Sequence, residues 1–238
     1  MGARVLDGAT IAFDLDGTLV DTAPDLVRAL NQVLAEEGLA PLAYETARNM
    51  VGRGAKHLIE RGYAATGLPL STDNSLALVE RFIAVYRAGI AAESRPFEGL
   101  EEALEALARH GATLCVCTNK RTDLSVALLD ALGLSKHFTA VVGADAAPAA
   151  KPDARHLICA IETAGGDIER AVMVGDSITD VSAARNAGVP VIVTSFGYTD
   201  IPHADLGADA MIDSYSELVD AIERVLRVHS PQSAKVSR

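Results

Sequence analysis

The sequence has no tryptophan, only three cysteines and no long uninterrupted apolar run. A membrane-spanning helix needs about 20 consecutive apolar residues, and the N-terminus lacks the pattern of a secretory signal peptide. Three cysteines are also too few for the paired framework of a disulfide-rich secreted domain. We therefore expect a cytoplasmic protein that neither spans a membrane nor depends on disulfide bonds.

Two of the cysteines, Cys115 and Cys117, alternate within a strand-like apolar segment. A zinc site would need further ligands at suitable spacing, and none lies nearby in the sequence. Free cysteine behaves as a small buried hydrophobe. We predict that both side chains, and that of Cys159 on a helix, are buried in the core.

Positive charge is also scarce, because 32 acidic residues stand against 21 basic ones and the formal net charge is −11. Proteins that bind nucleic acids or anionic membranes usually carry a basic surface, so neither partner is expected. The overall field also repels phosphate compounds. A phosphorylated ligand would have to be attracted by local groups.

Strand-like and helix-like segments alternate through most of the chain, and 49% of the residues are hydrophobic. The strand segments are almost continuously apolar, as in a parallel sheet covered by helices on both faces. We predict an α/β fold with a Rossmann-like parallel sheet. The expected strands are Thr10–Leu15, Thr113–Thr118, Ala140–Gly143, Ala171–Gly175, Val189–Thr194 and Ala210–Ile212, and the expected helices between and after them are Glu101–His110, Thr122–Leu132, Pro152–Ala164, Thr179–Ala187 and Ser214–Val228.

This alternation is interrupted after the first strand by roughly 100 residues of helical pattern, far more than a crossover connection requires. We predict an inserted helical unit at 21–95, an α/β core formed by 1–20 and 96–228, and a loosely held polar tail at 229–238. The helices expected in the insertion are Pro24–Glu37, Tyr44–Met50, Ala55–Thr66 and Ser71–Ala91.

The first strand ends on a pair of carboxylates, Asp14 and Asp16, followed by Gly17 and Thr18. Alternation along an extended backbone places both carboxylates on the same side of the strand end. Their repulsion would be relieved by a bound cation or a shared proton. A turn that merely closes the strand is the alternative, since Asp and Gly also favour turns.

Other polar residues follow other expected strands. Thr118 and Asn119 end the second strand, and Asp176 follows the fourth, with Asp180 four residues later. In open α/β sheets, ligands bind at the carboxyl ends of the strands. The pattern therefore predicts that these groups meet at one edge of the sheet.

These segments, together with Lys151-Pro152-Asp153, resemble the motifs of the haloacid dehalogenase superfamily of phosphohydrolases. The stretches from Asp14 to Asp21, from Val51 to Gly54 and from Thr118 to Lys120 are most similar to bacterial phosphoglycolate phosphatases. The resemblance covers nearly the whole chain, and it implies that the helical insertion is a cap that closes over the sheet.

The resemblance also implies the roles of the motif residues. Asp14 would be the nucleophile that takes the phosphoryl group, and Asp16 the general acid and base. Thr118 would bind a phosphate oxygen, and Lys151 would offset the clustered negative charge. Substrate contacts are further expected at Gly17 and at the backbone N–H of Asn119.

The same resemblance implies a metal site formed by Asp14, the backbone oxygen of Asp16, and Asp176. Oxygen ligands without cysteine or histidine favour Mg²⁺, which also binds substrate phosphate. Asp180 would orient a metal-bound water, although a charge at a helix N-terminus is an alternative explanation for this residue.

Within the insertion, Gly52, Arg53 and Gly54 lie just before an expected helix. Glycines permit close backbone approach, and free N–H groups at a helix N-terminus favour an anion. This loop could bind a second anionic group of the substrate, such as the carboxylate of 2-phosphoglycolate. A simple turn between two helices is the alternative.

The resemblance therefore predicts a Mg²⁺-dependent phosphatase of a small phosphorylated metabolite, with 2-phosphoglycolate as the expected substrate. A sugar-phosphate mutase of the β-phosphoglucomutase type shares the same motifs and is the main alternative. A non-catalytic binding protein on the same scaffold is a weaker one, because no motif residue is missing.

Overall fold

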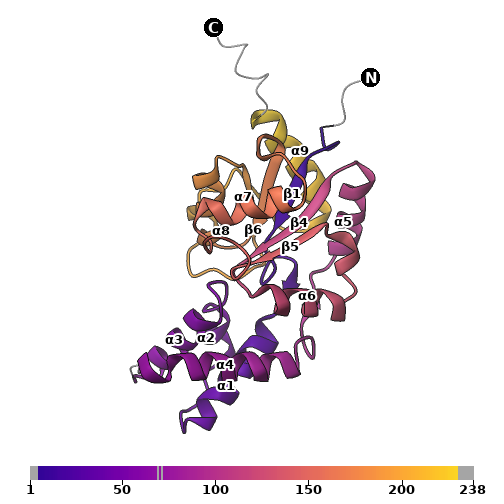
Figure 1. Cartoon of the computed structure of the whole chain (residues 1–238). Coiled ribbons are helices and arrows are strands. Elements are labelled where there is room, and N and C mark those ends of the chain that lie inside the picture. The colour runs from indigo at the N-terminus through magenta and orange to yellow at the C-terminus, as the bar shows by residue number, and fades with distance from the viewer. Residues whose placement is uncertain (1–4, 69, 71, 230–238) are drawn as a thin grey trace.

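The computed structural model describes residues 5–68, 70 and 72–229. Six parallel strands form one sheet in the spatial order β5-β4-β1-β6-β7-β8 (Figure 1). Strand β1 lies between β4 and β6, so the first strand of the chain is central. The α/β prediction with a Rossmann-like parallel sheet is confirmed. The strands are β1 Thr10–Phe13, β4 Thr113–Thr118, β5 Ala140–Gly143, β6 Ala171–Gly175, β7 Val191–Thr194 and β8 Ala210–Ile212.

Helices cover both faces of this sheet (Figure 1). One face packs against α5 Leu100–Arg109, α6 Thr122–Ala131 and α9 Leu218–His229. The other face packs against α7 Ala154–Thr163 and α8 Ile178–Ala187. Because successive strand residues point to opposite faces, the apolar runs of the sequence supply both layers.

The cysteines lie on the second of these faces. Cys115 and Cys117 are fully buried, as predicted, and burial raises the pKa of the Cys115 thiol to about 12. Cys159 differs from the prediction, since its position on α7 leaves it half-buried.

A second hydrophobic cluster belongs to four helices that lie together beside the sheet (Figure 1). They are α1 Ala23–Glu36, α2 Tyr44–Arg48, α3 Ala55–Ala65 and α4 Thr72–Ala88. In the described part of the chain, no helix is long and apolar enough to cross a membrane. We propose that these helices form a cap, with the division into 1–20 plus 96–228 and 21–95.

The chain passes from the sheet to the four helices through β2 and returns through β3, and these two connections lie side by side. Strand β2 (Val20–Asp21) pairs with β3 (Arg95–Pro96) in an antiparallel ladder. The buried carboxylate of Asp25 accepts hydrogen bonds from the backbone N–H and the hydroxyl of Ser94, at 2.8 and 2.7 Å. We call this paired segment the hinge. The sequence pattern did not predict it, because two-residue strands carry no periodicity.

The helices begin or end one to a few residues from the predicted bounds, and two of these differences have a local cause. Helix α7 begins at Ala154 because the side chain of Asp153 accepts the N–H of Arg155 and so caps the helix. The helix expected from Ser214 is divided into a 3₁₀ turn, Tyr215–Glu217, and α9. Helix α9 includes His229, the first residue of the predicted tail, and 230–238 lie outside the described residues.

Candidate active site

Three neighbouring strands end in polar residues at the same edge of the sheet. Asp14 follows β1, Thr118 is the last residue of β4, and Asp176 follows β6. Because β4, β1 and β6 are adjacent and parallel, these residues converge at one edge. All three residues are buried. The structure brings together the groups that the sequence pattern placed at separate strand ends.

Lys151 reaches the same place from the loop before α7. Its Nζ lies 2.9 Å from Asp14 Oδ1 and 2.6 Å from Asp180 Oδ1, and its side chain has no exposed surface. Nζ also donates a 2.7 Å hydrogen bond to the carbonyl oxygen of Cys117. One buried cation therefore neutralises part of the charge of two carboxylates.

Asp14, Asp176 and Asp180 form a carboxylate cluster, in which each offers an oxygen within 4.8 Å of the other two. Burial raises the pKa of Asp14 to about 6, although Lys151 opposes the shift. Burial and the two neighbouring carboxylates raise the pKa of Asp176 well above its usual range. When all three carboxylates are ionised, the single ammonium of Lys151 leaves an excess of negative charge that a divalent cation would offset. The donors are all hard oxygens, and the cluster therefore fits Mg²⁺.

Asp180 has a structural role that the sequence already offered as an alternative. Its Oδ2 accepts the backbone N–H groups of Asp176 and Ser177, at 3.2 and 3.0 Å, and the Ser177 hydroxyl at 2.6 Å. With Lys151 on Oδ1, both carboxylate oxygens bind protein donors. Asp180 therefore caps α8 and also fixes the ammonium of Lys151.

Asp176 is held from two sides. The Thr18 hydroxyl donates to Oδ1 at 3.1 Å, and the backbone N–H of Tyr198 donates to Oδ2 at 2.6 Å. Gly17 passes so close to this carboxylate that a Cβ at position 17 would lie 2.3 Å from Asp176 Oδ2. Its φ of +85° also favours glycine. Gly17 therefore allows the motif loop to pass beside the carboxylate cluster.

The loop that carries Lys151 is fixed by two side chains. Asn119 Nδ2 donates to the carbonyl of Lys151 at 3.2 Å, and Asn119 Oδ1 accepts its N–H at 2.9 Å. His156 Nδ1 accepts the same N–H at 3.2 Å, while its Nε2 lies 3.2 Å from the carbonyl of Val142. These contacts suit a neutral imidazole, and burial together with Lys151 lowers the pKa of His156 to about 4. The side chain of Asn119 is thus bound to the loop of Lys151, and the substrate contact expected at its backbone N–H stays a prediction.

Asp16 makes an ion pair that sequence reasoning missed. Lys120 Nζ lies 2.8 and 2.9 Å from the two carboxylate oxygens of Asp16, and the hydroxyl of Thr22 donates to Oδ1 at 2.7 Å. Burial disfavours the charged amine, but the Asp16 charge outweighs it and raises the pKa of Lys120. Lys120 follows Thr118 and Asn119 in the sequence, and its place in that motif was the only signal that could have identified it.

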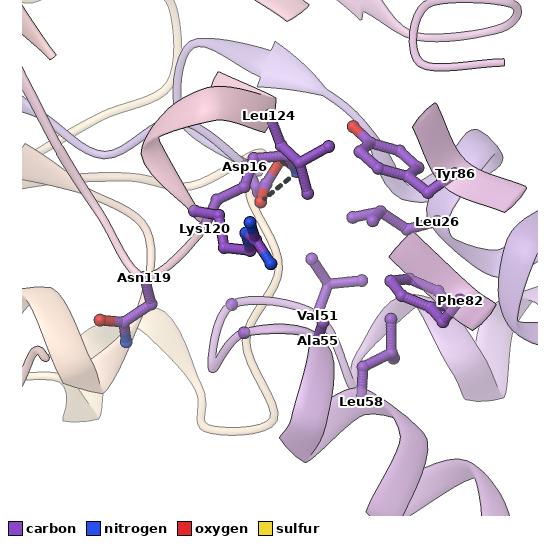
Figure 2. A pocket seen from close by; sticks show the side chains of 13 residues that line it. Asp16, Leu26, Val51, Ala55, Leu58, Phe82, Tyr86, Asn119, Lys120 and Leu124 are labelled. Atoms are coloured by element: carbon purple, nitrogen blue, oxygen red, sulfur yellow. Dashed lines mark hydrogen bonds and ion pairs between the residues drawn. The ribbon is translucent and has the colours of Figure 1, made fainter. Parts of the chain in front are cut away.

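A cavity of about 60 Å³ separates this ion pair from the helical unit. Figure 2 shows Leu26, Val51, Phe82 and other apolar side chains of that unit on one side, with the Asp16–Lys120 pair opposite. The ammonium of Lys120 also lies 4.6 Å from the centre of the Tyr86 ring, on α4. The cavity therefore has an apolar wall from the helical unit and a charged wall from the sheet.

The glycine loop before α3 reaches this cavity, but Arg53 lines a different, smaller hollow. Gly52 and Gly54 contribute to the wall of the cavity beside Lys120, and a Cβ on Gly54 would lie 3.1 Å from the carbonyl oxygen of Asn119. Arg53 is exposed and lines the smaller hollow with Ser177 and other residues. Of the three loop residues, the two glycines approach Lys120.

We expect Lys120→Met to destabilise the fold by about 3–5 kcal/mol, because it leaves the buried Asp16 carboxylate without its cation. The double variant Lys120→Met/Asp16→Asn should regain most of this loss, since it removes both charges. Urea unfolding of the wild type, both single variants and the double variant gives the coupling energy. Additive losses would show that the two residues do not stabilise each other.

The comparisons with known proteins agree with this geometry. A family model described as haloacid dehalogenase-like hydrolase matches residues 11–194, which include the carboxylate cluster. A phosphoglycolate phosphatase of Caulobacter vibrioides is 60% identical over 91% of this chain and 91% of its own length. A phosphoglycolate phosphatase of Agrobacterium fabrum is 50% identical over 93% of this chain and 95% of its own. A crystal structure from Haemophilus somnus, described as a predicted phosphoglycolate phosphatase, superposes with a TM-score of 0.83 at 29% identity, over 90% of this chain and 97% of that one.

Proposed function

The chain is a phosphatase that belongs to the haloacid dehalogenase-like hydrolase family, and from this premise we propose that it hydrolyses 2-phosphoglycolate to glycolate and phosphate with Mg²⁺. The observation that carries the proposal is the buried carboxylate cluster beside Lys151, at the carboxyl ends of β1 and β6. The substrate is inferred from the names of relatives that match the chain over nine-tenths of its length.

Asp14 is the proposed nucleophile. One carboxylate oxygen attacks the phosphorus, the bond to the leaving oxygen breaks, and the phosphoryl group is held as an aspartyl-phosphate until water cleaves it. Lys151 fixes the Asp14 carboxylate through the 2.9 Å ion pair and offsets the charge of the incoming phosphate. The hydroxyl of Thr118 lies at the adjoining strand end and is the proposed ligand of a phosphate oxygen.

Asp16 is the proposed general acid and base. As an acid it protonates the leaving oxygen of glycolate, and as a base it accepts a proton from the attacking water. Both carboxylate oxygens of Asp16 are bound by Lys120 Nζ, at 2.8 and 2.9 Å, so proton transfer to or from the substrate requires at least one of them to separate from Lys120.

Asp14, the backbone oxygen of Asp16, and Asp176 would hold the Mg²⁺ ion. When bound, it would neutralise the phosphate oxygens during transfer. Asp180 is proposed to orient a metal-bound water rather than to bind the ion directly, because the Lys151 ammonium lies 2.6 Å from its Oδ1 and its Oδ2 accepts three hydrogen bonds, whereas each Asp176 oxygen accepts one.

Rapid acid quenching tests this chemistry. After mixing with 2-phosphoglycolate and Mg²⁺, mass spectrometry of the digested enzyme should locate phosphate on the peptide that contains Asp14, while free phosphate accumulates over many turnovers. The Asp14→Asn variant should give no phosphopeptide. A phosphoenzyme that persists until a sugar phosphate is added would instead indicate the mutase alternative.

The glycine loop is proposed to recognise the carboxylate of the substrate, with Arg53 as its cation. Arg53→Ala should lower kcat/KM for 2-phosphoglycolate about tenfold to a hundredfold, the value of a charge-assisted hydrogen bond. Activity on p-nitrophenyl phosphate, which has no carboxylate, should change little. Equal losses on both substrates would assign Arg53 to the structure of the loop, and no loss on either would make the loop a plain turn.

A further inference from the structure

The loop that follows β7 contacts the carboxylate cluster through its backbone. The N–H of Tyr198 donates to Asp176 Oδ2 at 2.6 Å. The preceding residue is Gly197, where a Cβ would lie 2.2 Å from Asp176 Cβ and 2.6 Å from the carbonyl oxygen of Gly17. There is no room for a side chain here, so the backbone of the loop packs directly against Asp176.

The side chain of the same tyrosine reaches the hinge. Its hydroxyl donates to Asp21 Oδ1, in β2, and accepts the backbone N–H of Ala23 at 3.0 Å. Ala23 is the first residue of α1, so this N–H belongs to the end of the helix that has no partner within the helix. Burial and the Asp21 carboxylate raise the pKa of Tyr198, so the phenol keeps its proton.

A helix of the proposed cap contacts this loop as well. The guanidinium of Arg48, the last residue of α2, lies 4.7 Å from the centre of the Tyr198 ring. Arg48 also donates to the carbonyl oxygens of Phe196 and Gly197, each at 3.2 Å. The Tyr198 side chain is thus almost completely buried, between the hinge and α2.

We propose that Tyr198 is a positioning residue that couples the cation site at Asp176 to the hinge of the helical unit. A cation at the cluster fixes the Asp176 carboxylate, the backbone of Tyr198 follows through the short hydrogen bond, and the phenol then holds Asp21 and Ala23. By linkage, the position of the hinge biases cation binding to the same extent. The inference rests on the Mg²⁺ site of the proposed function and adds a route from that site to cap movement.

Hydrogen exchange at the Ala23 amide, measured with and without Mg²⁺ and without substrate, tests the coupling. In the wild-type protein Mg²⁺ should slow this exchange about fivefold or more, a typical size for coupling between sites. Tyr198→Phe retains the ring and the backbone N–H but loses the hydroxyl. It should bind Mg²⁺ about fivefold more weakly than the wild type by calorimetry, the same factor by linkage, and show no Mg²⁺-dependent change at Ala23.

Two further variants separate coupling from general loosening of the fold. Asp21→Ala removes the contact of the hydroxyl with β2 but leaves the hydrogen bond from Ala23, so it should reduce the Mg²⁺ effect without abolishing it. Tyr63→Phe is the matched control, because it deletes the phenol hydroxyl of another buried tyrosine, on α3, away from the carboxylate cluster and the hinge. It should retain the full Mg²⁺ effect, even if its melting temperature falls as much as that of Tyr198→Phe.

The possible outcomes distinguish a failure of the metal site from a failure of the coupling. Calorimetry that detects no Mg²⁺ binding to the wild type would overturn both the metal site and the coupling. Binding without any change in exchange at Ala23 would overturn the coupling alone. An undiminished Mg²⁺ effect in Tyr198→Phe would show that the phenol hydroxyl does not carry it.

Discussion

Replacing Asp14 by asparagine should reduce phosphate release from 2-phosphoglycolate by at least about 10⁴-fold, since the variant lacks the nucleophilic oxygen. Asparagine preserves the volume of the side chain, and Lys151 retains its contacts with Asp180 and the Cys117 carbonyl. The fold should therefore remain intact. Steady-state phosphate release by purified enzyme with Mg²⁺ measures the effect.

The Asp14→Asn variant should also gain stability when Mg²⁺ is absent. Burial raises the pKa of Asp14 from its usual 3.8 to about 6, so the folded state binds this proton more tightly than the unfolded chain. The stability that Asp14 contributes is then largest below about pH 4 and is lost as the pH rises through about 6. At pH 8 in chelator, the variant should unfold at a higher urea concentration than the wild type.

Asp209→Asn is the matched control for both measurements. Asp209 accepts the N–H of Val191 at the start of β7, at the opposite edge of the sheet. Its substitution should leave turnover near the wild-type value. Activity in Asp14→Asn close to that of this control would show that Asp14 is not the nucleophile.

Removal of the metal should have the next largest effect. EDTA should lower kcat by about 10³-fold, because several kcal/mol of charge stabilisation at the phosphate are lost, and Mg²⁺ should restore it. Asp176→Ala should raise the Mg²⁺ concentration needed for half-maximal activity. Titration of activity with Mg²⁺, after dialysis against chelator, gives both results.

Calcium provides the control for metal geometry. Ca²⁺ should restore little activity, because its longer and looser coordination misplaces the phosphoryl group relative to Asp14. Activity that is indifferent to chelation would contradict the metal site.

The order of elements could be predicted from the sequence because each one follows from local pattern. The bounds of β4, β5, β6 and β8 are those expected, since a buried parallel strand is a short apolar run between turn residues. The position of β1 between β4 and β6 was not predicted. Strand order depends on contacts between distant segments, which no periodicity encodes.

The residues of the site also divide into those that local motifs identify and those that depend on contacts between distant segments. Asp14, Thr118 and Asp176 could be identified because each follows a strand in a short motif. The partners of these residues could not, since Lys120 meets Asp16 across 104 positions of sequence and Tyr198 meets Asp21 across 177. Such pairs form between segments that are distant in the sequence and meet only when the chain folds, so local sequence pattern does not predict them.

The most direct test of the proposed function is a comparison of kcat/KM across phosphorylated metabolites, with Mg²⁺ and one enzyme preparation. The panel should contain 2-phosphoglycolate, hexose and pentose phosphates, and p-nitrophenyl phosphate. We expect 2-phosphoglycolate to be preferred by at least about tenfold, because a substrate carboxylate adds a charge-assisted contact that the others lack. A sugar phosphate that is hydrolysed more efficiently than 2-phosphoglycolate would contradict the proposed substrate.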